Sequence, residues 1–470
     1  MKKHTTEQLV FQGINSKKIH ASFDGGTITS DAGVMWLREV DRQIGLIDAL
    51  ANAIYDKRDQ RYVKQEMHTM IAQRIYQISC GYEDANNCDD LRIDPAFKMA
   101  VNRLPIEGDD LASQPTISRL ENAVTRSDLY RISEVLVDQF IDSYVKPPEI
   151  IVLDFDHTDN ETHGHQQLTL FNGYYDEYCY LPLHVYEGLS GKLITTILRP
   201  GKRPDGKENT AIAKRIVRKI QKAWPSTHLL FRGDSHFAQP ELFDCLEDNH
   251  ATYVIGITGN AVLQRLAEPI VAKVRRLFEN TNGAGICCFS SVRYQAGTWR
   301  SKRRVVIKAE MTPLGINIRF VVTNLGTASN EGVYKIIYCG RGNMENFIKD
   351  HKVYLKSDRS SCSSFLANQF RLFLHSAAYI LLQSLRQNLL RGSELAYARV
   401  NTIREKLLKI GARVIERKTM IRIHLPTSFS LKTTCFKNGC CFACAGSTLE
   451  NLKLFKNISL ASHSGSSLFT

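Results

Sequence analysis

The sequence predicts an α/β fold preceded by a helical N-terminal domain. Up to residue 147, apolar residues recur at spacings of three and four, which is typical of helices. After Pro147-Pro148, β-branched apolar runs alternate with helical stretches, which is typical of a sheet covered by helices. A block rich in β-strand patterns then follows, so we expect an α/β core that carries a β-rich insertion.

The N-terminal region contains several amphipathic patterns. Apolar residues at 34, 37, 40 and 44 predict one helix, and residues 63–78 and 126–145 predict two more. Residues 113–122 resemble the start of a DNA recognition helix, with Ser113 as a cap and Pro115 in the first turn. Arg119 would then face DNA. An ordinary capped helix in a bundle remains the alternative, because such caps are common.

The α/β part begins with an apolar run that ends in acid, residues 149–156. The alternation continues as predicted strands at 180–186 and 193–198, a helix at 209–224, a strand at 228–232, a helix at 240–249 and a strand at 253–257. In the block 258–337, two alternating runs flank Pro313-Leu314-Gly315 and predict an antiparallel hairpin. Helices resume at 343–352 and 365–390.

The net charge is +13 and the pI is about 9.1, which favours a polyanionic partner such as nucleic acid. The 12 cysteines occur without an export signal, so we interpret them as reduced thiols of a cytoplasmic, nucleoid-associated protein. Residues 370–385 are too polar to span a bilayer. The cysteines near the C-terminus follow the spacing C-x4-C-C-x2-C, which is not a standard zinc finger.

Three carboxylates form the candidate catalytic constellation. Asp154 and Asp156 leave the same face of one predicted strand. Asp234 follows another apolar strand, so its carboxylate would meet theirs at one edge of the sheet. Acids in this arrangement suit Mg²⁺, which takes a few protein oxygens plus water and substrate phosphate.

Glu345 is the candidate for the third carboxylate. Arg341, Lys349 and Lys352 lie on the same helical face, where they could hold phosphates beside a metal ligand. A solvated helix with ordinary ion pairs would show the same spacing.

A different interpretation rests on Asp154 and Asp156 alone. The run Asp154-Phe155-Asp156-His157-Thr158 also matches the D-x-D-x-T pattern of haloacid-dehalogenase-like phosphatases, in which Asp154 would be the nucleophile. That family carries a second acid four residues after its last metal ligand, whereas this chain has Ala238 there.

The chain resembles bacterial insertion-sequence transposases of the DDE superfamily, and most closely the transposase DDE domain group 1 family. Tyr338, Arg341, Glu345 and Lys352 match the Y-(2)-R-(3)-E-(6)-K signature around the catalytic glutamate of one branch of these enzymes. The resemblance covers about residues 25–425. It also includes the shorter stretches 28–33, 77–86, 113–122, 172–176 and 232–237.

The resemblance implies an RNase H-like catalytic core. The expected domains are an N-terminal arm (1–24), a helical DNA-binding domain (25–147), the first part of the core (148–257), the β-rich insertion (258–337), the second part of the core (338–390), a basic C-terminal region (391–428) and a poorly ordered Cys/Ser-rich tail (429–470).

The implied activity is metal-dependent cleavage at the ends of an insertion sequence, followed by strand transfer into target DNA. Asp156, Asp234 and Glu345 would bind two Mg²⁺ ions, for which Mn²⁺ could substitute. Asp154 would have a structural role. The partners would be terminal inverted repeats and target DNA, bound by a homodimer with no membrane contact. An inactive copy that binds DNA without cutting is the other alternative.

Five further residues are expected to contact DNA. Tyr338, Arg341, Lys349 and Lys352 would bind phosphates or pack beside them. Trp299, which lies next to several cations in the insertion, would stack on a displaced base, although an aromatic residue in a β-rich block is more often part of the core.

Overall fold

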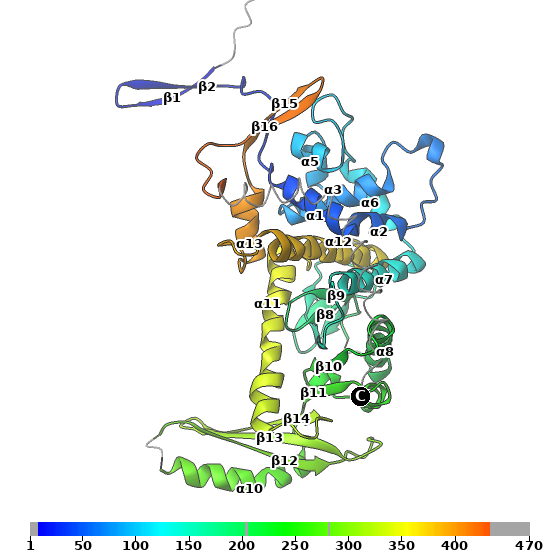
Figure 1. The fold of residues 1–470 in the computed structure, drawn as a ribbon, viewed down its shortest axis with the longest axis vertical. Helices are drawn as coiled ribbons and strands as arrows, with labels where there is room; N and C mark the ends of the chain where they lie inside the picture. Colours follow the sequence, from blue (N-terminus) through cyan, green and yellow to red (C-terminus); the bar gives the residue numbers. More distant parts are fainter. Residues whose placement is uncertain (1–7, 203–204, 281–282, 433–470) are drawn as a thin grey trace, which may run out of the picture. The chain divides into compact units, whose positions relative to one another are not determined.

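The computed structural model describes residues 8–202, 205–280 and 283–432, and the chain divides into two compact units. The larger unit comprises Ile44–Cys88 and Ala112–Ile380. The smaller unit comprises Met1–Gln43, Asp89–Leu111 and Leu381–Thr470. This division cuts across the domain boundaries expected from the sequence, because the predicted N-terminal helical domain is shared between the two units. Each unit is described by itself, with the labels of Figure 1.

An eight-stranded mixed sheet lies at the centre of the larger unit (Figure 1). Its strand order is β12-β13-β14-β11-β10-β4-β8-β9. The strands are β4 (Ile150–His157), β8 (Leu183–Glu187), β9 (Leu193–Ile197), β10 (His228–Gly233), β11 (Thr252–Ile257), β12 (Ile286–Tyr294), β13 (Arg303–Thr312) and β14 (Gly315–Thr323). β10 is parallel to its neighbours β4 and β11, and the other pairs are antiparallel. The carboxyl ends of β4 and β10 therefore meet at one edge of the sheet.

Helices cover both faces of this sheet. The face that carries Leu153 and Phe155 packs against α7 (Arg126–Asp142), α8 (Gly206–Ala223), α9 (Pro240–Asp248) and α10 (Ala261–Phe278). The opposite face carries Val152 and Leu230 and packs against Val333 and Tyr334. Because side chains alternate along a strand, Asp154 and Asp156 share the face of Val152. The candidate catalytic acids and α8 thus lie on opposite faces of the sheet (Figure 1).

A helical run from Gly332 to Tyr354 crosses the acid-bearing face. It is π-helical over Gly332–Tyr338, 3₁₀ over Cys339–Gly342, α-helical over α11 (Asn343–Lys349) and π-helical again over Asp350–Tyr354. The run begins before residue 343, where the sequence predicted its start. The two π segments frame the signature residues, and such segments are frequent at functional sites.

The remaining elements of the larger unit surround this core. They are α2 (Leu46–Asn52), a 3₁₀ turn (Gln60–Tyr62), α3 (Met67–Ser79), α6 (Gln114–Ala123), a 3₁₀ turn (Ser235–Phe237), the greater part of α12 (Phe365–Ser384) and a small sheet of β5 (Asn160–Glu161), β6 (Leu170–Asn172) and β7 (Glu177–Tyr180). The predicted strand at 180–186 is therefore divided between β7 and β8.

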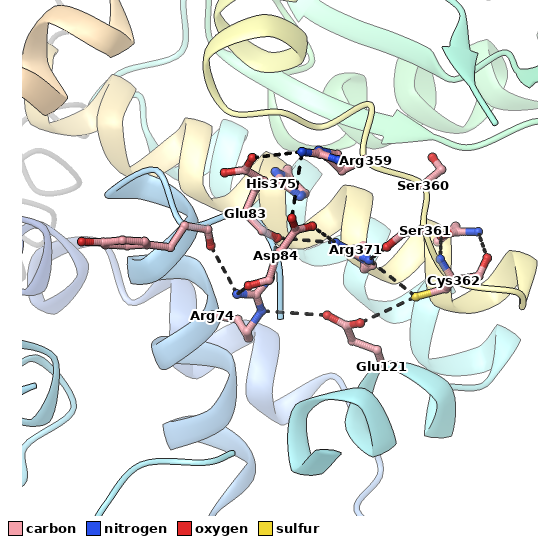
Figure 2. A network of polar contacts seen from close by, with 12 residues as sticks. Arg74, Glu83, Asp84, Glu121, Arg359, Ser360, Ser361, Cys362, Arg371 and His375 are labelled. Carbon is pink, nitrogen blue, oxygen red and sulfur yellow. Dashed lines mark hydrogen bonds and ion pairs between the residues drawn. The ribbon is translucent and has the colours of Figure 1, made fainter. Parts of the chain in front are cut away.

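Two buried arginines hold the loop after α3 in place (Figure 2). Arg74 donates to the carbonyl of Glu83 at 2.8 Å, and Arg371 donates to the same oxygen at 3.4 Å. Arg371 also donates to the Ser361 hydroxyl. The thiol of Cys362 lies 3.7 Å from a carboxylate oxygen of Glu121 on α6. These bonds join three stretches that are remote in sequence, and they account for the two buried guanidinium groups.

The smaller unit contains two short antiparallel sheets. β1 (Gln8–Ile14) pairs with β2 (Lys17–Ser22), and β15 (Ala412–Arg417) pairs with β3 (Ile28–Thr29) and β16 (Met420–His424). Its helices are α1 (Val34–Ile44), α4 (Asn87–Leu91), α5 (Pro95–Ala100), α13 (Val400–Ile403) and two π-helical segments, Leu385–Leu389 and Arg404–Leu408. α1 and α4 each extend past a boundary of the unit by one or two residues.

Most predicted elements of the α/β part are confirmed, and two predictions are wrong. The arm 1–24 was expected to be irregular, but residues 8–22 form the β1–β2 hairpin. The block 258–337, expected to be β-rich throughout, opens with the helix α10. Its strands extend the core sheet through the β14–β11 pair. The Cys-rich stretch lies outside the described residues.

In the described part of the chain, no helix has the length and apolar character needed to cross a membrane.

We predict that the buried imidazole of His184 makes the fold sensitive to acid. Burial first, and then the charges of Lys352 and Arg199, lower the pKa of His184 to about 3. The unfolded chain takes up this proton near pH 6.5, so stability is lost as the pH falls from 6.5 towards 3. The loss from this group is about 2 kcal/mol at pH 5. His184→Phe should reduce the difference in free energy of unfolding between pH 7.5 and pH 5.

The control is His165→Phe, at an exposed position, which should leave that difference as in the wild type. Urea denaturation at both pH values measures it. An unchanged pH dependence in His184→Phe would contradict the prediction.

Candidate active site

A buried ion pair lies beneath the candidate site. Asp154 on β4 is fully buried and accepts two hydrogen bonds from Arg232 on β10, both at 2.6 Å. The third nitrogen of this guanidinium donates to the carbonyl of Ile337 at 2.9 Å. Arg232 thus connects two central strands to the helical run that carries the signature residues. Burial raises the pKa of Asp154 to about 6, although Arg232 acts in the opposite direction.

Two glycines leave the space that this ion pair occupies. A Cβ atom at Gly188 would lie 2.3 Å from Nη2 of Arg232 and 2.4 Å from Oδ2 of Asp154. A Cβ atom at Gly340 would lie 2.7 Å from Nη1 of Arg232. The helical run can approach the Arg232 guanidinium this closely because residue 340 has no side chain.

Asp156 lies one step further along the same face of β4 and pairs with Arg341 at 2.6 Å. Burial is the main cause that raises the pKa of Asp156. The charge of Arg341 lowers it, and the negative charge of Asp234 raises it again. The two carboxylates lie at the carboxyl ends of the adjacent parallel strands β4 and β10.

Asp234 follows β10 directly and begins a short turn. Its carboxylate accepts a hydrogen bond from the backbone N–H of His236 at 2.9 Å and contacts the His236 ring nitrogen at the same distance. Burial acts to raise the pKa of Asp234, but the hydrogen bonds and charge of His236 outweigh it, and the net pKa is lowered. The rings of His157 and His236 are 4.7 Å apart, so β4 and β10 are also linked by aromatic contact at this edge.

The helical run is attached to the end of β4 at two points. Arg341 binds Asp156, and Lys352 binds the Asp159 carboxylate at 2.8 Å. Glu345 lies between these two attachments, one turn after Arg341. Its side chain is exposed and makes no hydrogen bond or ion pair with another described residue.

Tyr338 is the first of the four signature residues along the helical run. A Cβ atom at Gly256 would lie 2.5 Å from its hydroxyl oxygen, so the ring closely approaches β11. Burial raises the pKa of Tyr338, Arg341 lowers it and Asp234 raises it. Three of the four signature residues, Tyr338, Arg341 and Lys352, are therefore placed against the strand ends that carry the acids.

Comparison with known proteins decides the family. The sequence model of the transposase DDE domain group 1 family matches residues 11–438. The chain belongs to this family. No curated protein matches the sequence. A piggyBac transposase, solved by cryo-electron microscopy as a synaptic complex with hairpin DNA, matches with a TM-score of 0.41 and 11% identity, over 81% of this chain and 80% of that one.

The family gives the protein its function. It is a DNA transposase, an enzyme of the nuclease and strand-transferase type, and transposases of the DDE kind generally use divalent metal ions. The phosphatase interpretation is not favoured. Asp154, its required nucleophile, is fully buried and has both carboxylate oxygens bound by Arg232.

The acids of the transposase fit a divalent cation in part. No three His, Cys, Asp or Glu side chains among the described residues are close enough to hold a metal ion together. Asp156 and Asp234 alone supply two carboxylates from adjacent strands, and Mg²⁺ is commonly held by one or two carboxylates plus substrate phosphates. The repulsion that raises the pKa of Asp156 is of the kind that a bound cation relieves.

Three other predicted DNA contacts have different environments. Trp299 is only 8% exposed and packs against Phe243 and Tyr294, so it belongs to the core and its ring is not available for a base. The expectation that Trp299 stacks on a base is wrong. The cations beside it in the sequence do not indicate that its side chain is buried. Lys349 and Arg119 are exposed. The guanidinium of Arg119 donates to Thr116 on its own helix at 3.2 Å.

Sequence reasoning missed the role of Arg232. Its neighbours Gly233 and Asp234 were noted, but a pair between residues 232 and 154 leaves no local pattern. The one available sign was an arginine in an otherwise apolar strand, which requires a buried partner.

We predict that Gly340→Ala destabilises the transposase, because its Cβ would press against the Arg232 guanidinium at 2.7 Å. The expected loss is about 1 to 3 kcal/mol, as for other overpacked sites. Gly342→Ala is the matched control, since nothing lies within 4 Å of its Cβ position. It should be neutral or stabilising by up to about 1 kcal/mol, because alanine favours the helix. Urea denaturation of both variants measures the difference, and equal stabilities would refute the prediction.

Proposed function

We propose that this transposase cuts at the ends of an insertion sequence and joins them to target DNA, with Asp156, Asp234 and Glu345 as its catalytic carboxylates. The placement of Asp156 and Asp234 at the carboxyl ends of the adjacent parallel strands β4 and β10 is the observation that supports it. Glu345 completes the set, because its helical run is attached to β4 on both sides of it. When bound, two Mg²⁺ ions would polarise the scissile phosphate and activate the attacking hydroxyl or water.

Arg341 has a second task in this proposal. It forms an ion pair with Asp156 at 2.6 Å. Its own pKa is raised, chiefly by Asp156 and Asp234 against the effect of burial, so the guanidinium stays charged. With Asp156 serving as a metal ligand, Arg341 would be available to bind a phosphate beside the scissile bond.

Lys352, Lys349 and Tyr338 extend this phosphate-binding face. Lys352 is held by Asp159, and Lys349 lies one turn after Glu345 with an exposed ammonium group. Tyr338 is held against β11 by its close approach to Gly256. Side chains on one helical face can follow the backbone of a DNA strand without reading its sequence.

The finer features of the assignment are proposals as well. The central parallel strands β4, β10 and β11, with antiparallel neighbours, support an RNase H-like core. Residues 25–147 and the basic region 391–428 would bind DNA, with Arg119 on α6 as one contact. The DNA partners would be terminal inverted repeats and a target, bound by a homodimer in the cytoplasm near the nucleoid. A catalytically inactive copy is less favoured, since all three acids and all four signature residues are present.

We predict that Asp234→Asn and Glu345→Gln each abolish Mg²⁺-dependent cleavage of the element's own ends while DNA binding is retained. Neutral amides bind a hard cation far more weakly than carboxylates do. Cleavage is followed by mapping nicked strands on sequencing gels, and binding by fluorescence anisotropy in EDTA. Glu331→Gln, an exposed acid at the start of the same helical run, should cut like the wild type.

Cleavage at the wild-type rate by either variant would remove that residue from the proposed site. Turnover of a small phosphate monoester that is lost in Asp154→Asn would instead support the phosphatase interpretation.

A further inference from the structure

A basic groove lies between α7 and α8. Both helices pack on the face of the sheet away from the candidate catalytic acids. The volume of the groove is about 960 Å³. Five cations of α8 line it, together with two acids of α7: Lys214, Arg215, Arg218, Lys219, Lys222, Glu134 and Asp138. The proposed function gives this groove no role.

The two acids of the groove are already neutralised within it. Lys219 binds Glu134 at 2.7 Å and Asp138 at 2.9 Å. Arg215 binds Glu134 at 3.4 Å, and its guanidinium also lies 5.1 Å from the ring centroid of Tyr130. These contacts fasten α8 to α7, so two of the five cations have a structural task.

The other three cations form one stripe. Lys214, Arg218 and Lys222 follow one another at intervals of four residues, and all three are exposed. None of them makes an ion pair or hydrogen bond with another described residue. Successive members are separated by about 6 Å along the helix axis. That spacing is close to two steps of one DNA strand, which carries a phosphate about every 3.4 Å along the duplex axis.

We propose that Lys214, Arg218 and Lys222 bind the phosphate backbone of a DNA duplex on the sheet face opposite the catalytic acids. The proposal takes from the assigned function only that the transposase acts on DNA. The surplus of three positive charges in the groove favours a polyanion. None of the residues that line the groove is aromatic, so it offers no ring on which the bases of a single strand could stack. A duplex needs no such ring, because its outward phosphates are bound by cations alone.

This second surface would hold a stretch of DNA that is not being cut. The acids at the ends of β4 and β10 face the other side of the sheet, where the helical run from Gly332 to Tyr354 lies. A duplex in the groove therefore occupies a place different from that of the scissile phosphate. Donor DNA flanking the cleavage point and target DNA both have the required backbone.

The test measures the salt dependence of DNA binding by the full chain in EDTA, where no cleavage occurs. A labelled duplex of unrelated sequence is titrated at salt concentrations from about 50 to 200 mM, the range over which backbone contacts change affinity strongly. In the triple variant Lys214→Gln, Arg218→Gln, Lys222→Gln, the slope of log K against log salt should decrease in magnitude by about 2 to 3, since each phosphate contact contributes about 0.9. Arg218→Gln alone should decrease it by about 0.9.

A second triple variant controls for net charge. Arg265→Gln, Lys273→Gln and Arg276→Gln remove three exposed cations from α10, which covers the same face of the sheet. This variant should change the slope by less than about 1, because it removes no groove contact. An equal change in both triple variants would show that only the total charge matters and would overturn the proposal. So would an unchanged slope in the groove variant.

A single strand of the same length is the third arm of the experiment. Its slope should be the same in the groove variant and the wild type, and an equal decrease for duplex and single strand would refute the assignment to duplex DNA. The binding readout does not depend on cleavage. If the assignment of Asp156, Asp234 and Glu345 is wrong, the cleavage assay will show it and the salt slopes will not change. If the groove does not bind DNA, the salt slopes will show it and cleavage by the three acids will not change.

Discussion

The ion pair between Asp154 and Arg232 is the constraint on which the candidate site depends. It occupies the point where β4, β10 and the helical run meet, and Arg232 uses its remaining nitrogen to hold the carbonyl of Ile337. A charge left alone in such a position is costly, with typical losses of about 3 to 5 kcal/mol when one partner of a buried pair is removed. The two groups therefore hold the strands in register with the helix.

The candidate functional residues lie in two directions from this ion pair, along β4 and along the helical run. Along β4, the next residue on the same face is Asp156, whose carboxylate reaches Arg341. Along the helical run, the spacing from Arg341 places Glu345 one turn further on and Lys352 two turns beyond that. Both carboxylate oxygens of Asp154 are bound by the buried Arg232. Asp156 lies nearer the surface, and its partner is Arg341. Two carboxylates two residues apart on one strand thus differ in depth and in the arginine that each one binds.

The sequence predicted the strands that carry the acids because each is a short apolar run that ends in a carboxylate. It placed α8, α9 and the β13–β14 hairpin for similar local reasons. It failed at α10, which lies in a block that was expected to be β-rich, and at Trp299, which packs against Phe243 and Tyr294. It could not reveal that β14 pairs with β11, since the two strands have no shared local signal.

By itself the sequence determined the family of this protein, because four signature residues at fixed gaps are a local pattern that needs no fold to be recognised. It also named the three acids. Only the tertiary structure shows that Asp154 is fully buried and paired with Arg232, a guanidinium 78 positions away in the chain. The tertiary structure alone shows that the cations Lys214, Arg218 and Lys222 of α8 lie on the sheet face opposite the acids. Both features depend on which face of the sheet a side chain occupies and on what lies against it, and contacts between distant segments fix these properties.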